Sequence, residues 1–134
     1  MKVKDVIEPN IHFLYEEDTI LHASKLMKEE KIRNLPIIDK NKKLVGLITL
    51  REIIETIFHS PDQISVRSAM LKQEQVTCVK LDDDLTHAIE IMMTNKFGCL
   101  PVIDNNGNLI GIISEANLLK VLQKYSSLPV ESKS

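Results

Sequence analysis

The chain has 134 residues and a mass of 15.2 kDa, a length typical of a single domain. Its 43% hydrophobic and 27% charged residues exclude a disordered or collagen-like chain, and its two cysteines are too few for a disulfide-dense one. Seventeen basic residues against nineteen acidic ones give a net charge of −2, which argues against a nucleic-acid partner.

The first half of the chain alternates β-type and helical hydrophobic patterns. Ile20, Ala23 and Met27 recur at the spacing of one helix face, and Asp18 stands where an N-cap is expected. The predicted elements are a short strand, a helix, two strands around a polar turn and a second helix, at residues 11–14, 20–27, 35–39, 44–48 and 50–58.

The second half of the chain has the same pattern. Leu85, Ala88 and Met92 define a helix face, preceded by Asp84 as the expected cap. The turn between the next two strands contains Asn-Gly, a hairpin signal because both residues tolerate positive φ. Strands are expected near residues 76–79, 100–104 and 109–113, and a last helix at 115–125.

The two halves align without a gap when the sequence is shifted by 65 residues. Residues 19–54 match residues 84–119, with identities that include the Leu-Pro pair, the following Asp and the Gly of the next strand. We therefore predict two repeats at 1–58 and 66–125, a linker at 59–65 and a flexible tail at 126–134. Each repeat is too small to bury a large core alone, so the two should pack together.

Residues 35–39 and 100–104 read Leu-Pro-Ile-Ile-Asp and Leu-Pro-Val-Ile-Asp, and each is followed by a Val-Gly or Ile-Gly strand. The strands lead into Thr-x-x-Glu and Ser-x-x-Asn. This arrangement resembles tandem cystathionine-β-synthase (CBS) repeats, a Bateman module, over residues 3–122. Within that family, residues 96–101 and the linker are most similar to the CBS pairs of acetoin-utilisation-type accessory proteins.

The resemblance implies an α/β (α+β) fold of two β-α-β-β-α repeats related by a pseudo-two-fold axis. It also implies clefts between the repeats that often bind adenosyl ligands such as AMP, ATP or S-adenosylmethionine. Two copies commonly dimerise into a disk. Exposed apolar helix faces also predict a homodimer, because they exceed what a monomer normally leaves uncovered; they include Ile53, Ile57, Phe58, Leu118 and Val121.

Two strand-to-helix corners are the candidate ligand sites. At Thr49 and Glu52, a hydroxyl and backbone N–H groups can contact an anion, and the carboxylate can accept from ribose hydroxyls. Ser114 and Asn117 occupy the equivalent corner of the second repeat. The family normally has Asp at the positions of Glu52 and Asn117, and Asn117 lacks the charge. Thr-x-x-Glu is also a capping box, which stabilises a helix without any ligand.

The resemblance places each corner opposite the other repeat. Thr49 and Glu52 are expected to face Val76, Thr77, Cys78 and residues 96–99, which include Phe97 and Gly98. Ser114 and Asn117 are expected to face Ile11, His12 and residues 31–34, which include Arg33 and Asn34. Arg33 is the best candidate for a phosphate contact, because a guanidinium can engage two oxygens at once.

Two functions follow as alternatives. The first is a stand-alone regulatory module that binds AMP, ADP or ATP, or less favourably S-adenosylmethionine, and acts in trans on an unidentified protein partner. The second is a dimerisation scaffold whose degenerate sites stay empty. The sequence has no nucleophile–base motif and no third metal ligand beside Cys78 and Cys99, so we expect neither an enzyme nor a metal protein. It also lacks a long apolar run, which predicts a cytoplasmic protein without a membrane partner.

Overall fold

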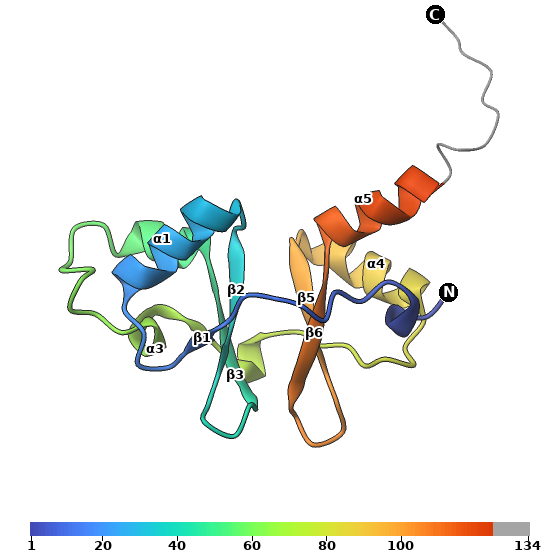
Figure 1. The fold of residues 1–134 in the computed structure, drawn as a ribbon, viewed down its shortest axis with the longest axis horizontal. Helices are drawn as coiled ribbons and strands as arrows, with labels where there is room; N and C mark the ends of the chain where they lie inside the picture. Colours follow the sequence, from blue (N-terminus) through green and yellow to red (C-terminus); the bar gives the residue numbers. More distant parts are fainter. Residues whose placement is uncertain (125–134) are drawn as a thin grey trace, which may run out of the picture.

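The computed structural model describes residues 1–124. Figure 1 shows two similar halves that lie side by side, each with a central β-hairpin and helices packed beside it. Along the chain, the first repeat contains η1 (Val3–Asp5), β1 (Leu14–Tyr15), α1 (Ile20–Glu30), β2 (Asn34–Ile38), β3 (Leu44–Thr49) and α2 (Leu50–Glu55). The second repeat contains α3 (Val66–Ala69), β4 (Leu71–Lys72), η2 (Gln73–Gln75), α4 (Leu85–Asn95), β5 (Cys99–Ile103), β6 (Leu109–Ser114) and α5 (Glu115–Gln123), although α3 and β4 pack with the hairpin of the first repeat. The mixed α/β fold of two tandem repeats is the one predicted from the sequence.

The two sheets have equivalent topologies. In the first sheet, β1 pairs in parallel with β2, β2 pairs antiparallel with β3, and β3 pairs antiparallel with β4. In the second, β5 and β6 form the antiparallel hairpin, Val79 bridges in parallel to Val102, and Glu8 bridges antiparallel to Ile112. The same parallel and antiparallel pairings therefore surround both hairpins.

Each repeat donates an edge segment to the other. Strand β4 follows the linker but pairs with β3 of the first repeat, and Glu8 precedes the first hairpin but pairs with β6 of the second. Figure 1 shows the N-terminal segment starting beside α4 and crossing the molecule to reach α1. The hairpin tips are also joined, since Leu44 N donates to Gly107 O and Leu109 N to Lys42 O, both at 3.0 Å. The exchanged segments and the hydrogen bonds between the hairpin tips link the two repeats.

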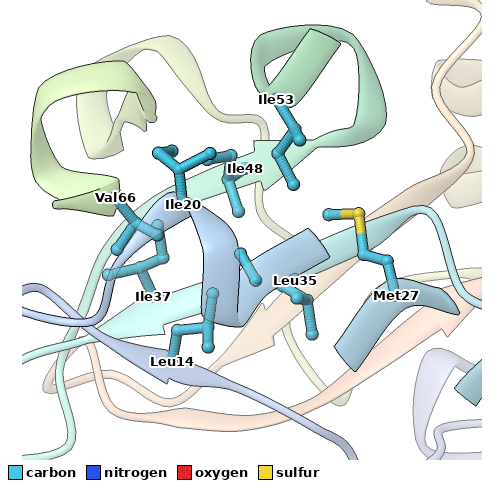
Figure 2. Packing of buried hydrophobic residues seen from close by; sticks show 9 residues of the cluster. Leu14, Ile20, Met27, Leu35, Ile37, Ile48, Ile53 and Val66 are labelled. Atoms are coloured by element: carbon cyan, nitrogen blue, oxygen red, sulfur yellow. The ribbon is translucent and has the colours of Figure 1, made fainter. Parts of the chain in front are cut away.

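Two hydrophobic clusters form the core, one for each repeat. The first gathers side chains from β1, α1, β2, β3, α2 and α3 (Figure 2). It contains Leu14, Ile20, Ala23, Met27, Leu35, Ile37, Ile48, Ile53 and Val66. The second cluster contains Val3, Val79, Ala88, Met92, Leu100, Val102 and Ile113. Val3 thus packs in the core of the second repeat, although it lies at the start of the first.

Several boundaries differ from the sequence prediction. The strand expected at 11–14 lies at Leu14–Tyr15, and the one expected at 76–79 is reduced to the bridge at Val79. Helix α2 ends at Glu55 instead of residue 58. The following Ile57 and Phe58 are 65% and 96% exposed, so no core contact extends the helix to them. Helix α5 ends at Gln123, and residue 125 and the tail predicted at 126–134 lie outside the described residues.

Two predicted side-chain roles are also corrected. The N-cap of α1 is Thr19, whose hydroxyl accepts from His22 N at 3.1 Å, whereas Asp18 accepts from Tyr15 N at 2.8 Å. Asp18 therefore closes the turn that precedes the helix. Ile53 was expected on an exposed face, but it is buried in the first core cluster.

Candidate functional site

The first corner joins β3 to α2. Thr49 is the N-cap of α2, and its backbone N–H donates to Glu52 Oε1 at 2.6 Å. The next backbone N–H, of Leu50, donates to Arg33 O at 2.9 Å. Glu52 is only 9% exposed, so the cap fixes a buried carboxylate at the start of the helix.

The second corner joins β6 to α5 and is more completely hydrogen-bonded. Asn117 Oδ1 accepts from Ser114 N at 3.0 Å and from Ser114 Oγ at 2.6 Å. Asn117 N in turn donates to Ser114 Oγ at 3.2 Å. An amide oxygen has two lone pairs, so these two donors use the acceptor capacity of Asn117.

A cleft of about 320 Å³ opens at the first corner. Of the predicted site residues, it brings together Thr49, Glu52, Thr77, Phe97, Gly98 and Asn34. Asn34 was expected in the other cleft. The remaining lining residues are Leu47, Arg51, Leu71, Gln75, Val76, Asn95, Lys96 and Cys99. Among the described residues, the lining does not include Cys78, whose thiol lies 3.8 Å from Val76 O.

A second cleft of about 290 Å³ opens at the other corner, and it brings Ser114 together with Arg33 and Asn34. The lining, drawn from residues 1–124, includes neither Asn117 nor His12. Asn117 is buried behind its cap, at 7% exposure. His12 Nε2 instead lies 3.2 Å from Glu30 Oε2 at the end of α1. Of the residues that the sequence placed at this corner or opposite it, the second cleft therefore has Ser114 and all of residues 31–34, but not Ile11, His12 or Asn117.

A wider trench of about 590 Å³ lies beside both corners. Asn34 and Gly98 line the trench and also both clefts, so they form the junction of all three spaces. The junction is tight: a Cβ atom added at Gly98 would lie 3.1 Å from Asn34 Nδ2 and 3.4 Å from Glu115 Oε1. A residue larger than glycine would push these side chains apart.

The sequence missed part of the first cleft. Leu71 and Gln75 reach it because β4 and η2 pack against β3 of the other repeat, a long-range exchange without a local sequence signal. Leu47 could have been found, since it lies two residues before Thr49 on the same strand and alternation places both on one face.

Cys99 lines the first cleft, and the burial of its thiol determines whether that thiol is protonated. Desolvation, reinforced by the nearby Glu115 carboxylate, raises the pKa of Cys99 to about 12. Burial also raises the pKa of Cys78. Both thiols are therefore protonated near neutral pH and are poor nucleophiles or metal ligands. Across residues 1–124, no three His, Cys, Asp or Glu side chains come together as a metal site.

The chain belongs to the CBS domain family, because residues 3–59 and 66–130 each match the model of the CBS domain. It is 34% identical over 121 residues to an uncharacterized 17.7 kDa protein of Acidianus ambivalens, which covers 90% of this chain and 73% of that protein. Three further relatives are longer, and the chain spans 60%, 24% and 22% of their lengths. No helix within residues 1–124 combines the length and apolarity needed to cross a bilayer.

Solved structures share this fold. The Vibrio cholerae protein described as acetoin utilization protein AcuB is 29% identical, with a TM-score of 0.86 over 100% of this chain and 98% of that one. CBSX2 of Arabidopsis thaliana, in complex with AMP, is 26% identical, with a TM-score of 0.82 over 93% and 98%. The CBS domain pair of protein MJ0100, in complex with 5′-methylthioadenosine and S-adenosyl-L-methionine, has a TM-score of 0.79 over 92% and 97%. At 22% identity, it shows the fold alone.

Proposed function

We propose that this chain is a regulatory CBS-pair module that binds an adenine nucleotide in the first cleft and acts in trans on a protein partner. The observation that carries the proposal is the placement of a buried carboxylate, Glu52, in a cleft between the repeats. The cleft volume of about 320 Å³ lies at the lower end of the range for small-molecule sites, roughly 300–1,000 Å³. The AMP complex of CBSX2 supports the choice of an adenosyl ligand.

The role we assign to Glu52 is to accept hydrogen bonds from the ribose hydroxyls. Its carboxylate can accept about four hydrogen bonds, and the Thr49 N–H supplies one of them. A charged acceptor makes bonds roughly twice as strong as a neutral one. Thr49, Thr77, Phe97, Gly98 and Asn34 supply the polar and apolar walls around the ligand.

The second cleft is the weaker site in this proposal. Both lone pairs of Asn117 Oδ1 are used by Ser114, so a ribose hydroxyl would have to displace a capping bond. The same observation supports the alternative, a scaffold with empty sites, for this half of the molecule. S-adenosylmethionine, which the MJ0100 domain pair holds, is the less favoured ligand here. Reduced thiols at Cys78 and Cys99 are typical of the cytoplasm, where we place the protein.

Ligand-induced stabilisation tests the proposal. The purified protein is unfolded, stripped of carried nucleotide and refolded, and its melting temperature is measured with AMP, ADP, ATP and S-adenosylmethionine. A ligand at 100 times its Kd stabilises the folded state by about 2.7 kcal/mol, which corresponds to a shift of roughly 5–15 °C at this length. The absence of a shift with every adenosyl compound at millimolar concentration would leave the scaffold as the better account.

Two matched variants locate the site. Thr49→Ala/Glu52→Ala and Ser114→Ala/Asn117→Ala each remove the same kind of helix cap, one from each repeat. The quantity compared is the ligand-induced shift, because both variants lower the melting temperature without ligand. We expect the shift to disappear only in Thr49→Ala/Glu52→Ala. An equal loss in both variants contradicts the preference for the first cleft.

A further inference from the structure

The helix pairs of the two repeats enclose equivalent grooves on the outside of the molecule. The groove between α1 and the start of α2 has a volume of about 360 Å³, and its lining includes Lys28 and Leu50. The groove between α4 and α5 has a volume of about 520 Å³, and its lining includes Met93 and Glu115, which lie at the positions 65 residues later. The duplication therefore provides two surfaces of the same construction whose chemistry can be compared position by position.

The two grooves differ in charge. The described lining of the α1–α2 groove holds three cations, Lys28, Lys31 and Arg33, but no carboxylate. Across residues 1–124, no carboxylate lies within 4 Å of these three side chains. The α4–α5 groove holds one lysine and one carboxylate, Lys96 and Glu115, among apolar side chains. The first groove is therefore cationic, whereas the second is apolar and electrically balanced.

The apolar side chains of the α4–α5 groove are open to solvent. Met93 is 75% exposed, Leu119 59% and Leu122 64%. Covering this groove removes apolar surface from water, which is favourable. Covering the α1–α2 groove instead removes water from three unpaired cations, which is costly unless each cation gains a partner. The α4–α5 groove is therefore the surface that gains more from being covered.

The charges also distinguish the ways in which two copies can meet. Two α4–α5 grooves bring together two lysines and two glutamates, and a two-fold axis allows Lys96 of each copy to lie near Glu115 of the other. Two α1–α2 grooves bring together six cations, three from each copy, without a carboxylate. An α1–α2 groove on an α4–α5 groove sets four cations, three from one copy and Lys96 from the other, against one carboxylate. Only the first pairing is balanced in charge.

We propose that a second copy of this chain occupies the α4–α5 groove with its own α4–α5 groove, so that the second repeats of the two copies meet across a two-fold axis. Met93, Leu119 and Leu122 of both copies form the apolar centre of this contact, and Lys96 and Glu115 form its charged rim. The cations of the α1–α2 groove stay in water. The inference concerns how the copies are arranged, and it holds with or without a bound nucleotide.

An exchange of residues between equivalent positions tests the pairing. Met93→Lys gives the α4–α5 groove the residue of the α1–α2 groove, and Lys28→Met is the reverse exchange. Both side chains are exposed, so neither substitution disturbs the core. Analytical ultracentrifugation over a dilution series gives the dimer Kd. We expect Met93→Lys to raise this Kd by about tenfold or more, because each copy places a new charge in the contact. Lys28→Met should leave the Kd unchanged.

A Kd that changes as much in Lys28→Met as in Met93→Lys would show that the α1–α2 groove is also in the contact, and would overturn the pairing. Lys25→Met is the control for an added apolar side chain, because Lys25 is exposed on α1 outside the groove. It should leave the Kd unchanged. An unmodified protein that stays a monomer throughout the dilution series would overturn the inference as a whole.

Cross-linking then shows which faces meet. Ile54→Cys and Leu119→Cys place a thiol at equivalent positions of the two repeats, where the native side chains are 56% and 59% exposed. With a short bismaleimide, we expect Leu119→Cys copies to be linked to each other. A mixture of tagged Ile54→Cys and untagged Leu119→Cys should give no tagged–untagged product. The unmodified protein is the blank for Cys78 and Cys99. A tagged–untagged product would overturn the pairing, and so would the absence of a link in Leu119→Cys.

Discussion

Glu52 and Asn117 occupy equivalent positions of the two repeats, yet their caps leave different capacities for a ligand. Each side chain accepts the backbone N–H of its own N-cap residue. The carboxylate keeps acceptor sites beyond that bond, whereas the amide oxygen is filled by the Ser114 hydroxyl. The difference between Glu52 and Asn117 thus makes the two corners chemically unlike, although the two hairpins that carry them have equivalent pairings.

Cys99 gives the folded protein a measurable alkaline sensitivity. Its pKa is raised from 9.0 to about 12 in the folded state, so between these values the unfolded chain loses its proton and the folded one does not. The unfolded state then binds fewer protons, and stability falls as pH rises. Between pH 8 and pH 10 we expect a loss of about 1 kcal/mol from this thiol. Urea unfolding at the two pH values measures it.

The comparison for this prediction is Cys99→Ala. The substitution lowers stability at both pH values, because it leaves a small cavity in a buried strand. It also removes the titrating thiol. The loss of stability between pH 8 and pH 10 should therefore be smaller than in the unmodified protein by the contribution expected from Cys99. If the stability of Cys99→Ala depends on pH as strongly as that of the unmodified protein, the thiol ionises equally in the folded and unfolded states, and the prediction is wrong.

At the scale of secondary-structure elements, local signals in the sequence were sufficient for the hairpins and the long helices. The turn of β5–β6 was predicted from Asn-Gly, and Gly107 indeed has a φ of +84°. The Asp104 carboxylate accepts from the backbone N and side-chain Nδ2 of Asn108 and from Asn106 N; these bonds close the turn and lower the pKa of Asp104. Such features depend on residues that are near neighbours in sequence.

The edge pairings could not be predicted in this way. The β4 and Glu8 pairings join segments separated by many residues, and both are too short to show a hydrophobic period. For the same reason the sequence placed Thr49 and Glu52 at a cleft but missed Leu71 and Gln75 on its wall. The duplication in the sequence indicated where the two strand-to-helix corners lie. The exchange of edge segments between the repeats determines which residues face these corners.

The exchanged N-terminal segment provides a test at this scale. Val3 is fully buried, and its contacts are with the second core cluster. Val3→Ala removes two methyl groups from that core, so we expect a loss of about 2 kcal/mol in the free energy of unfolding. Met1→Ala is the control, because Met1 is 63% exposed and should change stability by less than about 0.5 kcal/mol. Equal effects in urea unfolding would contradict the role of Val3 in the second core.

At the scale of the whole molecule, several large apolar side chains remain uncovered. A groove of about 520 Å³ between α4 and α5 is lined by Met93, Leu119 and Leu122, which are 75%, 59% and 64% exposed. In the first repeat, Ile57 and Phe58 are similarly exposed after α2. Apolar patches of this kind on soluble proteins usually mark an interface. We therefore propose that the functional unit is a homodimer that covers these helix faces.

Light scattering after gel filtration at micromolar concentration tests the dimer. We expect a mass twice the 15.2 kDa of the chain, because burial of the groove removes apolar surface from water. Leu119→Lys/Leu122→Lys places two charges in the groove and should shift the mass to that of one chain. Leu81→Lys changes an exposed leucine outside the groove and should leave the dimer intact. A mass near 15.2 kDa for the unmodified protein would contradict the dimer, and a dimer that survives the double substitution would place its interface on another face.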